Sequence, residues 1–339
     1  MGKEDDRGAM SRPIRIGISL GDIGGVGPET AAKALLAVGD TESEFTLYCN
    51  RELFAELGGR FRWAAELLDC ENARFSGTPE FGGHAPFGRP TPQAGKFAFH
   101  SLETAAKAAL AGKIDAIITA PLSKEGLKLA GYNYPGNTEI LRDIAGVERV
   151  VMMLIADDFR VVPATRHIPI SSVPDLITEE LIEDTVRILT ESLVKYERIE
   201  KPRIGVLALN PHGGEGGLLG DEETKIRAAV ERLRLDDYTV EGPLVPDIAF
   251  IPRFREKYDA VVGMYHDQVL IPLKMAGFER GVNATLGLPF IRTSPDHGTA
   301  FDIAGKDIAD PTSTIEAIKL AIKWARATRF SLDDSSPTD

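Results

Sequence analysis

Three of the six histidines in this chain share one position in the sequence pattern, and together they could bind a metal ion. His167, His212 and His266 each come just after an apolar run that is typical of a buried strand. A single loop histidine is more often a turn or packing residue. Three at equivalent strand ends favour a shared site, because strand ends on one edge of a sheet converge. Neutral imidazoles suit zinc, cobalt, nickel or iron, and three protein ligands leave a coordination position open for substrate.

A second group of side chains could bind an anion. Lys274, Asn283 and Arg292 lie within the stretch 258–306, each near glycine or proline. One interpretation makes Lys274 a solvated helix residue and Arg292 a surface strand residue. However, Arg292 lies inside the apolar string LPFIRT, where its charge is costly to bury unless it meets an anion. The three side chains together predict a ligand that carries a carboxylate or phosphate.

The elements that position these residues alternate between strand and helix patterns. This alternation predicts an α/β fold with a mainly parallel sheet and helices on both faces. Apolar runs predict strands at 14–20, 45–48, 114–119, 150–156, 159–164, 203–209 and 260–262. Apolar residues at helical spacing predict helices at 31–38, 94–112, 178–195, 222–233 and 315–327. The sequence has no internal repeat.

The glycine-rich segment 21–29 invites comparison with a dinucleotide-binding loop. Its glycine spacing does not fit G-x-G-x-x-G, and the next predicted strand is followed by Cys49 and Asn50 rather than the acid that would hold a ribose. The segment instead predicts a tight strand-to-helix turn, with Asp22 at the rim and Pro28 at the first helical position.

Composition excludes several classes of protein. A length of 339 residues suits two domains or one large α/β unit, and the net charge of −12 argues against a nucleic-acid partner. The two cysteines have no CxxC spacing and suggest no disulfide framework. The charged amino terminus lacks a signal core, and the longest apolar run is too short to span a bilayer. We therefore expect a cytoplasmic protein with no membrane partner.

Several longer strings are similar to one known family. They are TAPLSKEGL (119–127), TRHIPISSVPD (165–175), LNPHGGEGG (209–217), MYHDQ (264–268) and GVNATLGLPFIRTSPDHGTA (281–300). Over about residues 14–328 the chain resembles the 4-hydroxythreonine-4-phosphate dehydrogenase family of pyridoxine biosynthesis. Strings of this length are far more specific than a single glycine motif.

The resemblance implies a fold like that of isopropylmalate dehydrogenase, with two α/β/α lobes flanking a cleft. The first lobe would combine residues 12–125 with 285–330, and the second would span 126–284 and carry the metal and the dimer interface. Flexible tails would cover 1–11 and 331–339.

The family also implies site residues. A divalent metal (zinc, cobalt, manganese or magnesium) would be held by His167, His212 and His266. Substrate contacts would come from Asn137, Thr138, Lys274, Asn283 and Arg292. The string 296–306 is similar to the loop that holds NAD adenosine in the wider superfamily, which implies cofactor contacts from His297, Gly298, Thr299, Ala300 and Asp302.

The implied assembly is a homodimer with shared active sites. In that arrangement His266 of the partner subunit would complete a site that contains His167 and His212. The two-fold axis would make both sites equivalent.

The implied reaction is a metal-dependent, NAD-linked oxidative decarboxylation. The substrate would be 4-phosphohydroxy-L-threonine (4-hydroxythreonine 4-phosphate), and the products 3-amino-2-oxopropyl phosphate and CO2. The metal would bind the substrate hydroxyl and ease hydride transfer to NAD. Lys274 and Asp267 are the candidates for proton transfer. A carboxylate at Asp302 would accept a bond from the adenosine ribose and favour NAD over NADP, although Asp302 could instead cap the turn before Gly305.

Two departures from the family pattern bear on the substrate. Asn137 stands where the family usually has histidine, and GDIGGVGPE stands where it usually reads GDPAGIGPE. An asparagine can hydrogen-bond an anion but cannot carry charge. Within the family, the alternatives are a threonate- or erythronate-4-phosphate dehydrogenase and an aromatic dihydrodiol dehydrogenase. An alternative of another class is a non-catalytic metal- or phosphate-binding protein that has kept the fold.

Overall fold

A computed structural model describes residues 12–40, 42–80, 82 and 86–333 of the chain. The amino-terminal tail predicted at 1–11 lies outside the described residues, as does 334–339 of the carboxyl-terminal one. Residues 331–333 continue the last helix, so the prediction of a flexible tail from Ser331 onward is wrong at its start.

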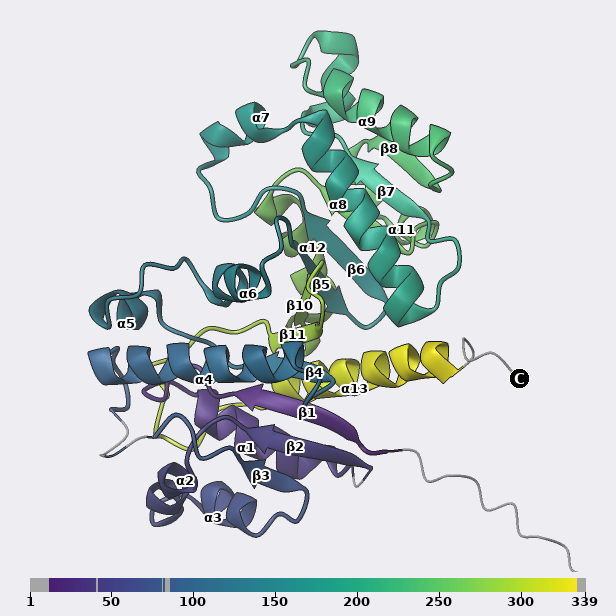
Figure 1. Cartoon of the computed structure of the whole chain (residues 1–339). Coiled ribbons are helices and arrows are strands. Elements are labelled where there is room, and N and C mark those ends of the chain that lie inside the picture. The colour runs from purple at the N-terminus through teal and green to yellow at the C-terminus, as the bar shows by residue number, and fades with distance from the viewer. Residues whose placement is uncertain (1–11, 41, 81, 83–85, 334–339) are drawn as a thin grey trace, which may run out of the picture.

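One sheet of eleven strands runs through the whole molecule, in the order β3-β2-β1-β4-β11-β10-β5-β6-β9-β7-β8 (Figure 1). The strands are β1 (Ile14–Ser19), β2 (Ser43–Leu47), β3 (Ala73–Phe75), β4 (Ala116–Thr119), β5 (Val151–Ala156), β6 (Phe159–Pro163), β7 (Ile204–Leu207), β8 (Val240–Leu244), β9 (Ala260–Gly263), β10 (Val282–Leu286) and β11 (Ile291–Pro295).

The sheet is mainly parallel, which confirms the predicted α/β class. Neighbours pair in parallel within β3-β2-β1-β4-β11 and within β6-β9-β7-β8. Between these halves, β10 pairs antiparallel with β11 and β5, and β5 pairs antiparallel with β6. The parallel strands of the two halves therefore run in opposite directions. The lobe boundaries at 125/126 and 284/285 remain a prediction.

Helices cover both faces of the sheet, as the alternating pattern predicts. The longer ones are α1 (Gly27–Val38), α2 (Arg51–Gly58), α3 (Arg62–Leu68), α4 (Pro92–Leu110), α5 (Lys124–Leu129), α6 (Asn137–Ala145), α8 (Glu179–Ser192), α9 (Glu223–Leu235), α12 (His266–Gly277) and α13 (Thr312–Asp333). The short ones are η1 (Ile170–Ser172), α7 (Val173–Leu176), η2 (Leu193–Glu197), η3 (Pro211–Gly217), α10 (Pro246–Ala249), α11 (Pro252–Arg255) and η4 (Phe278–Arg280). The chain passes from the first half to the second through α5 and α6 (Figure 1).

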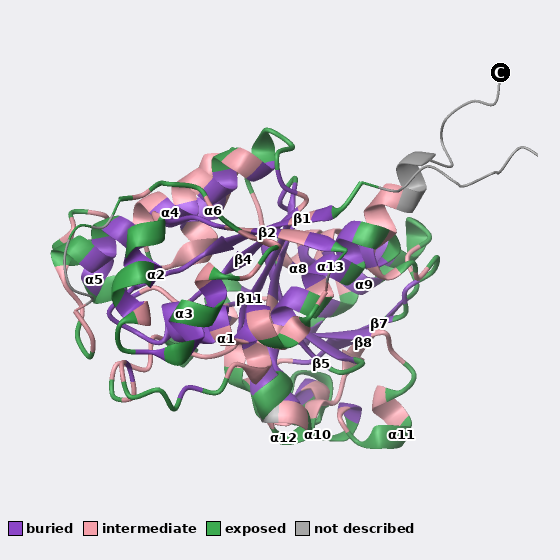
Figure 2. Cartoon of the chain, turned by 90° about the horizontal axis from the view of Figure 1, so that it is seen from below, coloured by how far each residue is buried: buried purple, intermediate pink, exposed green. Residues whose placement is uncertain are grey.

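The core explains why the strand sequences read as nearly continuous apolar runs. Every residue of β4, β5, β7 and β9 is buried, and the strands form the buried centre of the view in Figure 2. On β4, Ile118 packs in the cluster that contains Ile318 and Trp324 of α13, whereas Ile117 packs in the one that contains Leu102 and Ala105 of α4. A sheet covered on both faces leaves no polar face for alternation to mark.

Strands β10 and β11 were not predicted from the sequence, whereas β5 and β6 were. Polar residues interrupt β10 and β11, among them Asn283, Thr285, Arg292 and Thr293, so neither strand reads as an apolar run. Among the helices that the structure describes, none combines the length and apolar character needed to cross a membrane.

Candidate active site

Two of the three predicted metal ligands meet within one chain. His167 follows β6, and His266 begins α12 directly after β9. Because β6 and β9 are adjacent parallel strands, their carboxyl ends lie side by side, and the two imidazole centroids are 5.5 Å apart. The expectation that strand-end histidines converge holds for this pair.

His212 stands apart from that pair. It lies in η3, after β7, and its side chain is 67% exposed. Within the described residues, no three His, Cys, Asp or Glu side chains form a cluster that could hold a metal. Within one chain it is His266, and not His212, that lies beside His167. The predicted site, in which His266 of a second chain completes His167 and His212, stays a prediction.

The loop that carries His212 is held in an unusual conformation. The backbone of residues 212–216 is left-handed throughout, and the φ angles of 54° at His212 and 44° at Glu215 are strained for residues other than glycine. The buried carboxylate of Glu223 fixes the start of the loop by accepting bonds from the backbone N–H groups of Leu209 (3.0 Å) and Asn210 (2.7 Å). Glu223 thus places His212 at a defined position on the surface.

Carboxylates orient two of the imidazoles. The Nδ1 of His266 lies 2.7 Å from Asp267 Oδ1, and the Nδ1 of His212 lies 2.8 Å from Glu215 Oε1. In each case Nε2 is left for a metal, which is the usual arrangement of a histidine ligand and its carboxylate. Burial, assisted by the charge of Lys124, lowers the pKa of His167 and favours its neutral, metal-binding form. The donor set therefore fits a divalent metal.

Lys274 lies on α12, two turns after His266, and its Nζ is 3.5 Å from Oδ2 of Asp296. Burial raises the pKa of Asp296, while Lys274 and His266 act in the opposite direction, so these groups lie close together. Asp296 was not predicted as a site residue. Its position directly after β11, at the head of the string DHGTA, is the signal that could have identified it.

Arg292 is 3% exposed and is not a surface strand residue. Its guanidinium donates to the hydroxyls of Thr119 and Thr285, and no carboxylate among the described residues forms an ion pair with it. Burial lowers the pKa of Arg292 to about 10, so it stays charged at neutral pH. Nearby on β10, the Oδ1 of Asn283 is buried without a hydrogen-bond partner in the described part of the chain. A buried cation beside an unpaired acceptor fits a ligand with an anionic group and a donor.

Asn137 and Thr138 begin α6. The side chain of Asn137 donates to the carbonyl oxygen of Ala120 at 3.3 Å. The negative charge of Glu139, in the same turn, raises the pKa of both His167 and Arg292 against the larger effect of burial. Glu139 therefore lies near both groups that the sequence singles out, although sequence reasoning did not include it.

The predicted cofactor loop packs on the turn between β1 and α1. The backbone N–H of Val26 donates to the carbonyl oxygen of Thr299 at 2.9 Å, and a Cβ on Gly25 would come 2.5 Å from that oxygen. Asp302 is exposed in the same loop. The close contact with the loop 296–302 therefore explains why the turn between β1 and α1 needs a glycine at position 25. The glycine is needed for packing and does not indicate a Rossmann phosphate loop.

Asp22 is fully buried, so its predicted place at the rim of that turn is wrong. Its Oδ1 accepts from the backbone N–H of Gly24 at 2.8 Å, whereas Oδ2 has no partner among the described residues. Burial raises the pKa of Asp22 to about 6. The turn folds inward because it packs under residues 120–126, where the backbone N–H of Asp22 donates to Pro121.

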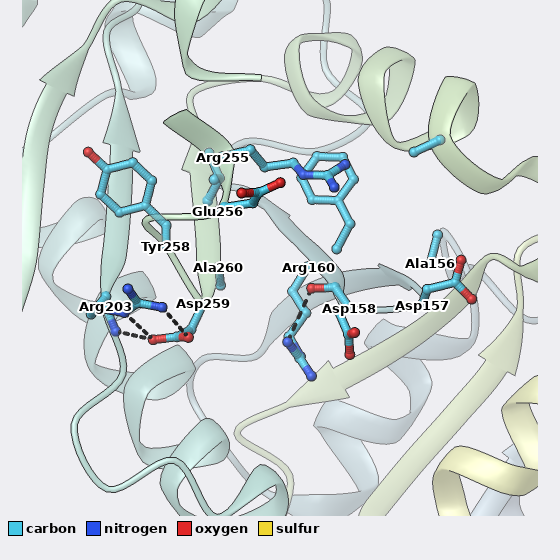
Figure 3. Close-up of a pocket in the computed structure, with 13 residues that line it drawn as sticks. Ala156, Asp157, Asp158, Arg160, Arg203, Arg255, Glu256, Tyr258, Asp259 and Ala260 are labelled. Carbon is cyan, nitrogen blue, oxygen red and sulfur yellow. Dashed lines mark hydrogen bonds and ion pairs between the residues drawn. The ribbon is translucent and has the colours of Figure 1, made fainter. Parts of the chain in front are cut away.

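A separate cavity of about 530 Å³ lies at the opposite ends of the strands β6 and β9 from the histidines (Figure 3). Its walls come from the starts of β6 and β9 and from Arg203, just before β7, whereas the histidines follow the ends of these strands. Two of its arginines are already neutralised: Arg203 pairs with Asp259 at 3.1 Å and Arg160 with Glu197 at 3.0 Å. This cavity is not part of the histidine site.

Comparisons with known proteins identify the family of the chain. The family model of pyridoxal phosphate biosynthetic protein PdxA matches residues 54–321. A 4-hydroxythreonine-4-phosphate dehydrogenase of Ruegeria sp. (strain TM1040) is 40% identical over 326 residues, which cover 93% of this chain and 98% of the relative. The crystal structure of a 4-hydroxythreonine-4-phosphate dehydrogenase from Klebsiella pneumoniae matches with a TM-score of 0.78 at 34% identity, over 92% of this chain and 99% of that one.

A more distant structural relative carries a different name. A terephthalate 1,2-cis-dihydrodiol dehydrogenase from Burkholderia xenovorans LB400 matches with a TM-score of 0.65 at 28% identity, over 92% of this chain and 98% of that one.

Proposed function

The chain belongs to the PdxA family of pyridoxal phosphate biosynthetic proteins and is a dehydrogenase, and we propose that it oxidises and decarboxylates 4-phosphohydroxy-L-threonine with NAD at a divalent metal. In the balanced reaction, the substrate and NAD⁺ give 3-amino-2-oxopropyl phosphate, CO2 and NADH. The observations that carry the proposal are the pair His167 and His266 and the buried Arg292, which forms no ion pair among the described residues, with the charge of Glu139 raising the pKa of both His167 and Arg292 against the larger effect of burial.

The substrate's anionic group would bind at Arg292. A guanidinium offers paired N–H donors that match two oxygens of a phosphate or carboxylate. Asn283 would accept a bond from a substrate donor, because its Oδ1 has no other partner in the described chain. Asn137 and Thr138, at the start of α6, would contribute neutral polar contacts to the substrate. Lys274 would contribute a charged contact.

His167 and His266 would hold the metal, and imidazole donors favour zinc or cobalt over manganese or magnesium. The bound metal would supply a Lewis acid for the substrate hydroxyl and the carbonyl that replaces it. Asp267 is 70% exposed and contacts His266 Nδ1, so we assign it the orientation of that ligand rather than proton transfer. Lys274 Nζ would then carry the proton that the substrate carbon needs once CO2 has left.

The third ligand would come from a second copy of the chain. One chain brings together only two histidines of the described residues, and His212 sits on an exposed loop beside Leu218, which is 82% exposed. In a two-fold dimer the His212 loop of each subunit would complete the site of the other. In the proposed homodimer with shared active sites, each site would therefore take His167 and His266 from one subunit and His212 from the other.

NAD would bind along the loop of His297, Gly298, Thr299, Ala300 and Asp302. The Nε2 of His297 is buried without a partner among the described residues, and the φ of 44° at Ala300 is strained. Unpartnered polar atoms and strained backbone are common where a loop is shaped for a ligand. Asp302, exposed at the end of this loop, is available to the adenosine ribose.

A substrate comparison tests the proposal. NADH and CO2 should form fastest with 4-phosphohydroxy-L-threonine, measured beside D-threonate 4-phosphate, D-erythronate 4-phosphate and a cis-dihydrodiol of an aromatic carboxylate. Faster turnover of the unphosphorylated diol would favour the activity named for the Burkholderia xenovorans relative. Absence of NADH with every substrate, in metal-loaded protein, would favour a non-catalytic binding protein.

A further inference from the structure

Arg292 is a buried cation whose hydrogen-bond acceptors carry no charge. Its Nε and Nη2 donate to Oγ1 of Thr119 at 3.1 Å and 2.7 Å, and its Nη1 donates to Oγ1 of Thr285 at 2.8 Å. Burying a charge without a counter-ion is costly, so such an arrangement calls for a reason. Among the described residues, the other buried arginine is neutralised in the ordinary way, since Arg160 pairs with the carboxylate of Glu197.

Strand register places both threonines beside the guanidinium. On β4, Ile117 is the register partner of Arg292, and Thr119 lies two residues further along on the same face. On β10, the residue before Thr285 pairs with the residue after Arg292, so in this antiparallel pair Thr285 lies opposite Arg292. Three neighbouring strands at the middle of the sheet therefore fix one side chain (Figure 1).

The hydrogen bonds leave the guanidinium with donors to spare. Of its five N–H groups, the two threonines accept three, so one remains on each terminal nitrogen. Two such donors match two oxygens of a phosphate or carboxylate. Asn283, two residues before Thr285 and so on the same face, has a buried Oδ1 without a partner in the described chain, which points independently to a ligand here.

We propose that Thr119 and Thr285 are positioning residues that hold the Arg292 guanidinium, without an ion pair to a carboxylate of the described chain, for an anionic group of the substrate. Their hydroxyls fix the direction of the side chain, whereas a carboxylate in either place would neutralise the charge that the substrate needs. This inference rests on the proposed function, in which Arg292 receives the substrate.

The test uses inorganic phosphate as the probe and isothermal titration calorimetry of the full chain without NAD. Thr119→Val and Thr285→Val remove each hydroxyl at nearly constant volume, and Thr119→Ser and Thr285→Ser keep it. Thr293→Val is the matched control, because this buried threonine on the same strand donates to the carbonyl oxygen of Ala317 instead. If Thr119→Val does not fold, the smaller Thr119→Ala takes its place.

We expect each valine variant to weaken phosphate binding by about tenfold or more, as for the loss of a hydrogen bond to a charged group. The serine variants and Thr293→Val should bind phosphate as the wild type does. In steady state, the valine variants should raise KM for the phosphorylated substrate more than they lower kcat.

Unchanged phosphate affinity in both valine variants would overturn the inference, and so would a wild type that binds no phosphate. A failure of the proposed function is distinguishable, because it would show as absent NADH formation in a wild-type protein whose phosphate binding still depends on the two hydroxyls.

Discussion

The imidazoles of His167 and His266 lie with their centroids 5.5 Å apart in the same chain. They come from the ends of two adjacent parallel strands, β6 and β9, so the backbone of one subunit sets their separation. His212 follows β7, the next strand beyond β9, but η3 carries it away from the pair. A metal that needs three protein ligands must therefore draw the third from outside this pair.

Metal removal should abolish activity if these histidines form the centre of the site. Chelation should stop NADH formation, and Zn²⁺ or Co²⁺ should restore it. His167→Ala and His266→Ala should each lower the metal bound per chain, measured by elemental analysis, together with the rate. His100→Ala is the matched control, because that histidine contacts Glu103 and Tyr132 on the first half of the molecule. Full activity of a chelated, metal-stripped sample would contradict the metal site.

Substitution of Asp267 should weaken metal binding rather than proton transfer. Its Oδ1 lies 2.7 Å from His266 Nδ1, so Asp267→Asn should weaken metal affinity by about tenfold or more, as for other carboxylates that orient a ligand histidine. Excess Zn²⁺ should then restore most of the rate. If Asp267 instead transferred a proton, the variant would bind metal normally and stay slow at every metal concentration.

Asp22 should make the folded protein less stable as pH rises. Burial raises its pKa to about 6 in the folded state from 3.8, so between these values the folded state holds the proton more tightly than the unfolded one. Stability then falls with pH across this window, and the full penalty, about 3 kcal/mol at most, is present at pH 7. Asp22→Asn should remove it, raising the free energy of unfolding at pH 7 but not at pH 3.5.

Urea unfolding at several pH values measures this effect. Glu71→Gln, at an exposed acid of the same half, is the control and should change little. Equal unfolding free energies of the wild type and Asp22→Asn at pH 7 would show that the buried carboxyl carries no penalty.

The position of Asp302 predicts a preference between cofactors. An exposed carboxylate beside the adenosine ribose would repel a 2′-phosphate, so we expect kcat/KM to be at least about tenfold higher with NAD than with NADP. Asp302→Asn should narrow that ratio by improving use of NADP. A ratio near one in the wild type, or one unchanged by the substitution, would mean that Asp302 only closes the turn before Gly305.

The sequence predicted these sites to different depths. Strand ends could be located from apolar runs, which is why His167, His266 and the parallel sheet were found. Thr119 and Thr285 could not be found, because their contact with Arg292 depends on the register of three strands, two of which have no apolar run to mark them. Asp22 was misplaced for a related reason, since the spacing of a turn does not show whether another loop covers it.

The division of ligands between subunits is the most decisive prediction. If His167 and His266 of one chain meet His212 of the partner subunit, two inactive variants can rescue each other only in certain pairs. In a mixed dimer of His167→Ala and His212→Ala, one site collects both lesions and the other receives three intact ligands. Random exchange makes about half of the dimers mixed, so about a quarter of wild-type activity should return.

The matched control is a mixture of His167→Ala with His266→Ala. Both residues serve the same site in one chain, so each site of the mixed dimer keeps one lesion and no activity should return. Subunit exchange is verified separately, by mass spectrometry of differently tagged chains. Rescue in this second mixture, with none in the first, would show that His266 comes from the partner subunit. Rescue in neither mixture would show that all three ligands come from one chain.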